Sequence, residues 1–116
     1  MSDFRSLKVY QDARSLNKEI FLLLKDPKFD RNIRNQLSRA STSIMLNIAE
    51  GAGRFTSKDK KNFFIIARAS ALEWSALFDV IEDLKLLASD KCEGFRKKLE
   101  EISKMLFGLI RNLEKG

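Results

Sequence analysis

The sequence predicts an all-α protein folded as one antiparallel, up-down four-helix bundle. Apolar residues recur at helical spacing along nearly the whole chain of 116 residues. A single proline and five glycines leave little room for a turn-rich all-β fold. Hydrophobic residues make up 44% and charged residues 33% of the chain, as in ordinary globular domains with a real core. We therefore expect a single domain that spans residues 1–116.

The first two helices are expected over residues 7–25 and 31–49. In the first, six apolar side chains from Val9 to Leu24 lie on one stripe, and Pro27 ends the helix. In the second, apolar residues from Ile33 to Ile48 share a face, and Gly51 is the natural stop.

The third and fourth helices are expected over residues 57–88 and 90–114. Thr56 followed by Asp59 resembles a capping box that opens the third helix, and Asp90 with Glu93 offers the same arrangement for the fourth. Because the connections between neighbouring helices are short, an antiparallel arrangement is favoured.

The third helix carries two apolar faces. One face is expected to enter the core and consists of Phe63, Ala67, Ser70, Trp74, Phe78 and Ile81. A second set points the opposite way and consists of Ile65, Ala69, Leu72, Ala76, Val80 and Leu87. Either the helix is central in the monomer, or the second face meets another subunit. Four helices of this size leave little room for a central one, so the pattern favours a homo-oligomer. Its expected interface is Met45, Leu46, Ile65, Ala69, Leu72, Ala76 and Val80.

A row of polar residues follows one side of the second helix. It consists of Gln36, Arg39, Ser43, Asn47 and Glu50. Arg39 and Glu50 are about 16 Å apart along the axis, so each needs a partner from another helix. Arg68 and Glu73 on the third helix are the candidates. The row either fixes helix register through satisfied hydrogen bonds or lines a binding recess near Arg54.

The charge balance points to polyanions. The net charge is +6 and the isoelectric point is near 9.6, which favours nucleic acid as a partner. The candidate binding residues are Arg34, Arg39, Arg54, Lys58, Lys60, Lys61 and Arg68. The alternative is that the lysine cluster is an ordinary solvated helix start. Most phenylalanines fit core positions, which leaves Tyr10 and Phe55 as candidates for base stacking.

The composition excludes several kinds of chemistry. Without any histidine, the chain cannot build a Ser-His or Cys-His nucleophile or a usual zinc site, so we expect no metal, no cofactor and no enzymatic activity. The single cysteine, Cys92, cannot form an internal disulfide, which favours a reducing cytoplasm. No apolar run is long enough for a membrane span, and the start lacks a secretory pattern.

Two stretches resemble a known bacterial family of four-helix bundles. They are "SLKVYQDARSL" and "IRNQLSRASTSIMLNIAEGAGRFTSKDKKNFFIIARASALE". The chain is similar there to proteins encoded by intervening sequences inside 23S ribosomal RNA genes. The matching residues include Gln36, Arg39, Ala40, Ser43, Ile44, Asn47, Ile48, Ala49, Glu50, Gly51, Arg54, Phe63, Ala67, Ser70 and Glu73. The resemblance implies a homopentamer with a basic surface. It also implies similarity to the accessory protein of diversity-generating retroelements, which binds nucleic acid and a reverse transcriptase.

Two functions remain open from the sequence. The first is a non-enzymatic oligomer that binds structured RNA or DNA through phosphates. The second is a protein-interaction scaffold in which the polar row is purely architectural.

Overall fold

The computed structural model describes residues 3–115, and these form four α-helices preceded by one short 3-10 helix. The elements are η1 (Phe4–Ser6), α1 (Lys8–Leu23), α2 (Arg31–Ala52), α3 (Ser57–Asp83) and α4 (Ser89–Lys115). There is no strand within this range, which confirms the all-α prediction.

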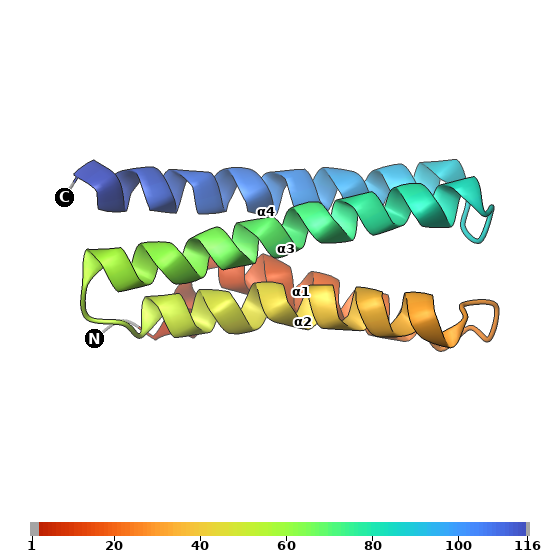
Figure 1. Cartoon of the computed structure of the whole chain (residues 1–116), viewed down its shortest axis with the longest axis horizontal. Helices are drawn as coiled ribbons and strands as arrows, with labels where there is room; N and C mark the ends of the chain where they lie inside the picture. Colours follow the sequence, from red (N-terminus) through yellow and green to blue (C-terminus); the bar gives the residue numbers. More distant parts are fainter. Residues whose placement is uncertain (1–2, 116) are drawn as a thin grey trace.

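The four helices lie side by side in an elongated body of 45 × 21 × 20 Å (Figure 1). The α1–α2 and α3–α4 connections lie at one end of this body, whereas the α2–α3 connection lies at the other end, near both ends of the chain (Figure 1). α3 packs against both α2 and α4, and α1 packs mainly against α2. The long α3 therefore joins the two halves of the bundle.

The core runs the full length of the bundle. Trp74 is fully buried and stacks on Phe78, whose ring in turn stacks on Phe95 of α4 with centroids 4.7 Å apart. The buried face of α3 consists of Phe64, Ala67, Ala71, Trp74, Phe78 and Ile81. The expected core positions Phe63 and Ser70 were therefore wrong, and both are only partly buried. The buried face of α3 is shared between two neighbours, because α3 contacts α4 as extensively as it contacts α2, and Ser70 lies at its edge, bonded to Ser43 of α2.

The helix ends that differ most from the predicted bounds are the C-terminal ends of α2 and α3, while the ends of α1 and α4 differ by one or two residues. α2 continues through Gly51 to Ala52, because Gly51 keeps helical geometry and is buried against α3. α3 ends at Asp83, five residues before the predicted end, in a turn where Lys85 has a left-handed φ of 57°. The Leu86 amide donates to Ile81 O and the Lys85 amide to Glu82 O, each at 3.0 Å. This is a Schellman motif, and it was missed because lysine occupies the position that glycine usually takes.

The predicted cap of α3 is confirmed, whereas the predicted cap of α4 was wrong. At α3 the Thr56 hydroxyl accepts a hydrogen bond from the Asp59 amide at 3.1 Å, as the capping pattern predicts. At α4 the helix already begins at Ser89. Asp90 is therefore in the first turn and not at the cap position.

The second face of α3 is exposed in the single chain. Leu72, for example, is 53% exposed, and Ile65, Ala69, Ala76 and Val80 are exposed beside it. Leu46 on α2 is exposed as well, whereas Met45 is only partly exposed, because part of its side chain packs on the core. Leu87 is also partly buried, because it lies in the turn after α3.

Candidate nucleic-acid interface

The α2–α3 connection forms a tight corner at the end of the bundle that holds both chain termini (Figure 1). A Cβ atom on Gly51 would lie 2.7 Å from Cε1 of Phe64, so only glycine lets α2 approach the start of α3 this closely. The Gly53 amide donates to Ala49 O at 3.2 Å and closes α2, and Thr56 then caps α3. Only Gly53, Arg54, Phe55 and Thr56 lie between the two helices.

Basic side chains surround this corner, and they are neutralised to different degrees. Arg54 pairs with Glu50 at 3.1 Å and its guanidinium lies over the Phe63 ring at 4.6 Å. The Lys60 ammonium donates to Ala52 O at 3.0 Å, which helps to cap α2. Lys61 lies 3.8 Å from Glu114 of α4. Lys58 is exposed and has no ion-pair partner within residues 3–115. The corner therefore keeps positive charge available to a ligand.

Phe55 is the most exposed large apolar side chain in the described part of the chain, with 96% of its surface open. It borders a hollow of about 570 Å³ whose apolar lining includes Phe4, Leu46 and Ala49. Glu50, Arg54 and Asp59 supply its polar lining. Tyr10, the other candidate for base stacking, is buried and packs edge-on against Phe4, so that prediction was wrong.

The remaining predicted basic residues lie elsewhere. Arg34 is at the opposite end of α2, about 30 Å from Arg54 along the axis, and donates to Phe29 O at 3.0 Å and Asp26 O at 3.4 Å. Arg39 is exposed half-way along α2. Arg68 lies over the Phe107 ring of α4, with 5.6 Å to its centroid. The seven predicted residues thus do not form one patch, and only Arg54, Lys58, Lys60 and Lys61 gather at the corner.

The polar row on α2 is largely satisfied within the bundle. Ser43 shares a hydrogen bond of 2.8 Å with Ser70 of α3, and the Asn47 amide donates to Ser43 O at 2.8 Å and Ser43 Oγ at 3.0 Å. Gln36 donates to Asn32 at 3.1 Å. These bonds fit a role in helix register, and Arg39, Ser43 and Asn47 also line an open hollow of about 720 Å³ on this face of α2.

The expected partners of the charged members of this row were wrong. Glu50 pairs with Arg54, which follows it by four residues in the α2–α3 connection, and not with Arg68. Glu73 and Arg39 are both exposed, and within residues 3–115 they form no ion pair with each other. The prediction failed because it sought partners on another helix only, whereas Arg54 of the α2–α3 connection lies four residues after Glu50 and pairs with it.

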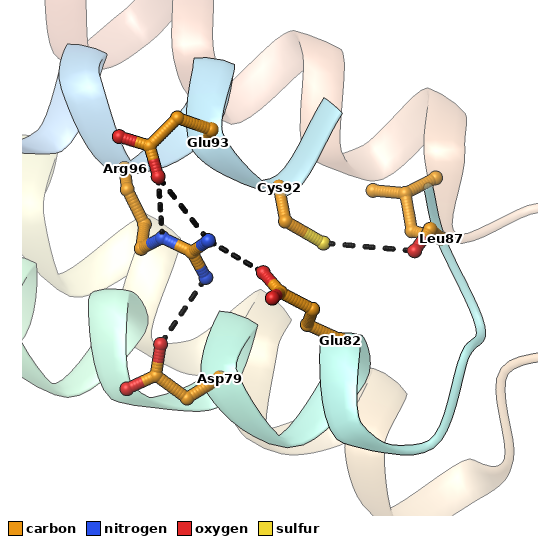
Figure 2. A network of polar contacts seen from close by, with 6 residues as sticks. All are labelled: Asp79, Glu82, Leu87, Cys92, Glu93 and Arg96. Carbon is orange, nitrogen blue, oxygen red and sulfur yellow. Dashed lines mark hydrogen bonds and ion pairs between the residues drawn. The ribbon is translucent and has the colours of Figure 1, made fainter. Parts of the chain in front are cut away.

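Sequence reasoning also missed two polar clusters. The buried Ser41 donates to Asn17 of α1 at 2.7 Å. At the far end of α3, Arg96 of α4 binds three carboxylates: Asp79 at 3.1 Å, Glu93 at 3.3 Å, and Glu82 (Figure 2). The hydrogen bond with Glu82 raises the pKa of Arg96 above its ordinary value. Pairs of opposite charge across helices were the signal that could have revealed this cluster.

Cys92 lies beside the Arg96 cluster and is fully buried, with its thiol directed toward Leu87 O at 3.9 Å (Figure 2). Burial raises the pKa of this thiol, which keeps it protonated and unreactive. Within the same range no group of three or more histidine, cysteine or carboxylate side chains is placed to hold a metal ion. Nor does any helix there have the length and apolar character to cross a membrane.

Comparison with known proteins places the fold in a family. The model of the 23S rRNA-intervening sequence protein family matches residues 5–108. The chain belongs to this family. One solved structure similar to this family member is a protein of unknown function of the S23 ribosomal protein family from Bacteroides thetaiotaomicron VPI-5482. It is 23% identical, the match covers 89% of this chain and 95% of that one, and the TM-score is 0.84. No curated protein matches the chain. The likeness to the solved structure concerns the fold alone.

Proposed function

We propose that this protein is a non-enzymatic oligomer that binds RNA or DNA through phosphate contacts at the α2–α3 corner. The observation that supports this most strongly is the gathering of Arg54, Lys58, Lys60 and Lys61 around one exposed connection. Lysine and arginine side chains bind phosphates without sequence preference, and a net charge of +6 adds long-range attraction.

We further propose that antiparallel up-down bundles assemble as a homopentamer through the exposed apolar face of α3. A face of this kind costs free energy in water, and packing it against another copy removes that cost. The small side chains of Ala69 and Ala76 allow a neighbouring backbone to approach closely. Several copies would present several basic corners at once, which raises the avidity for a long polyanion.

The nucleic-acid proposal is tested by fluorescence anisotropy with labelled RNA and DNA at two salt concentrations. Phosphate contacts release counterions, so affinity should fall steeply as salt rises, with a slope that reports the number of contacts. Absence of binding to both nucleic acids at low salt would overturn the proposal.

The assembly is tested by light scattering on Leu72→Asp. We expect a charge at this position to reduce the measured mass and leave the helical circular dichroism unchanged. Leu22→Asp on α1 is the matched control, because Leu22 is 54% exposed and Leu72 is 53% exposed. A Leu72→Asp protein that keeps the mass of the unmodified protein would show that the interface lies elsewhere.

A scaffold for protein partners is the second candidate, and the internally satisfied bonds of Ser43, Ser70 and Asn47 favour it. If the polar row only fixes register, the outer surface is what carries function. A protein partner that remains bound after nuclease treatment would support this alternative.

For the nucleic-acid binder and for the scaffold alike, the buried free thiol of Cys92 fits a reducing compartment such as the cytoplasm.

A further inference from the structure

The backbone on both sides of Phe55 is constrained by hydrogen bonds, although the Phe55 side chain contacts almost nothing. The residue before it is tied down, because the Arg54 amide donates to Gly51 O at 3.2 Å. The residue after it is Thr56, whose side chain caps α3. An apolar ring that is 96% exposed on a backbone constrained on both sides is preorganised for a partner.

The hollow beside Phe55 has the size and lining of a site for one planar, partly polar group. Its volume of about 570 Å³ lies in the range of small-molecule pockets. Phe4, Leu46 and Ala49 offer apolar contact, while the carboxylates of Glu50 and Asp59 can accept hydrogen bonds from amino groups. A nucleobase combines these properties, since it has an apolar face and an edge of donors and acceptors.

The charged residues favour a base inside the hollow and a phosphate outside it. Asp59 lines the hollow and has no ion-pair partner within residues 3–115, so its carboxylate repels a phosphate placed there, whereas the Glu50 carboxylate is paired with Arg54. Lys58 offers a phosphate contact outside it, because its ammonium has no carboxylate partner in the range the structure describes. A paired base is stacked inside its duplex and cannot reach the Phe55 ring, so the geometry selects unpaired nucleotides.

We infer that the hollow beside Phe55 binds an unpaired nucleobase, with the Phe55 ring stacked on it and Lys58 bound to a neighbouring phosphate. This inference rests on the proposed nucleic-acid function and deepens it. The ligand class is single-stranded nucleic acid or the loop of a folded RNA, and fully paired duplex binds only through the basic side chains.

The test compares a labelled single-stranded RNA oligonucleotide with a fully paired RNA duplex, using Phe55→Ala, Phe55→Trp and the unmodified protein. Phe55→Ala should weaken single-strand binding roughly tenfold and leave duplex binding within about twofold, because each stacked base is lost only from the single strand. Phe55→Trp should keep single-strand affinity, and its fluorescence should be quenched by the single strand only. Phe21→Ala on α1 is the control, since Phe21 is also exposed, at 44%.

The possible failures are distinguishable. If Phe55→Ala binds both probes as the unmodified protein does, or loses both equally, base stacking is overturned and phosphate binding stands. If the unmodified protein binds neither probe at low salt, the proposed function and this inference are both overturned. If Phe55→Ala lowers the mass in light scattering, the ring belongs to a subunit contact, which also overturns the inference. Circular dichroism of each variant checks that the helices are retained.

Discussion

At the N-terminal end of α3, Arg54 and Lys58 are exposed beside Phe55, which is itself 96% exposed. At its C-terminal end, three carboxylates share one guanidinium, and a thiol is buried beside them (Figure 2). The first end has four positive and two negative residues between positions 50 and 61. The second end holds Asp79, Glu82 and Glu93 against Arg96.

The difference shows how one helix can serve two purposes. At the C-terminal end the Arg96 guanidinium of α4 is bound by carboxylates, and its pairs with Asp79 and Glu82 hold α3 to α4. At the N-terminal end α3 is joined to α2 by close backbone packing at Gly51 and by caps. Charged side chains such as Lys58 are therefore not needed to hold that end together and remain available. The following predictions test this division of roles.

The largest effect on the free energy of unfolding is expected at Gly51, where α2 packs closely against the start of α3. Gly51→Ala should lower the free energy of unfolding by about 2 kcal/mol, because the new methyl carbon would lie 2.7 Å from the Phe64 ring and 3.1 Å from Cβ of Phe63. Gly94→Ala in α4 is the matched control. Nothing lies within 4 Å of its Cβ position, so it should gain about 0.5–1 kcal/mol from helix propensity. Urea denaturation measures both, and equal effects of the two changes would contradict the close-packing argument.

A charge reversal tests whether the N-terminal end is the ligand-binding end. Lys58→Glu should weaken binding of RNA at low salt by roughly tenfold, because it removes one phosphate contact and adds repulsion. Lys91→Glu, at the start of α4 and the opposite end of the bundle, should change affinity by less than about twofold under the same conditions. Anisotropy titrations compare the two proteins. A similar loss for both would mean that binding follows net charge and has no preferred end.

Residues with strong local signals were predictable from the sequence. The four helices follow from apolar spacing, and the exposed second face of α3 follows from the opposed position of Ile65, Leu72 and Val80. The cap at Thr56 follows from the capping pattern, since it depends only on residues three apart.

The parts that failed depend on distances between segments far apart in the chain. Arg96 contacts Asp79 from 17 positions away, and the spacing of one helix does not reveal that pair. The turn at Lys85 carries no glycine to mark it, and the passage of α2 through Gly51 depends on how closely Phe64 approaches. The hollow beside Phe55 likewise required knowing that Phe4 of η1 lies next to the α2–α3 connection.

The charge cluster at the C-terminal end is tested by Arg96→Met. Removing the guanidinium leaves three neighbouring carboxylates without their partner, and we expect a loss of about 1 kcal/mol in the free energy of unfolding at neutral pH. The pKa of Arg96 is raised in the folded state. Its stabilising effect is therefore complete below the ordinary arginine pKa and is lost only as the pH rises through the raised value.

The control for that change is Arg14→Met, because Arg14 is exposed and has no ion pair within residues 3–115. It should leave the free energy of unfolding nearly unchanged in the same urea titration. RNA affinity should change by no more than a small factor in Arg96→Met, since that guanidinium already binds carboxylates. If the affinity fell as far as in Lys58→Glu, the C-terminal end would also bind the ligand.

The smallest effect on the free energy of unfolding is expected at Lys85, in the turn after α3. Lys85 has a left-handed φ of 57°, which costs a residue with a Cβ atom more than it costs glycine. Lys85→Gly should raise the free energy of unfolding by about 0.5 kcal/mol, after the larger chain entropy of glycine in the unfolded state is subtracted. Lys85→Ala removes the same charge but keeps the Cβ atom, so it should give no such gain. If urea titration shows equal changes for both variants, the charge of Lys85 and not its backbone conformation is what matters at this end of α3.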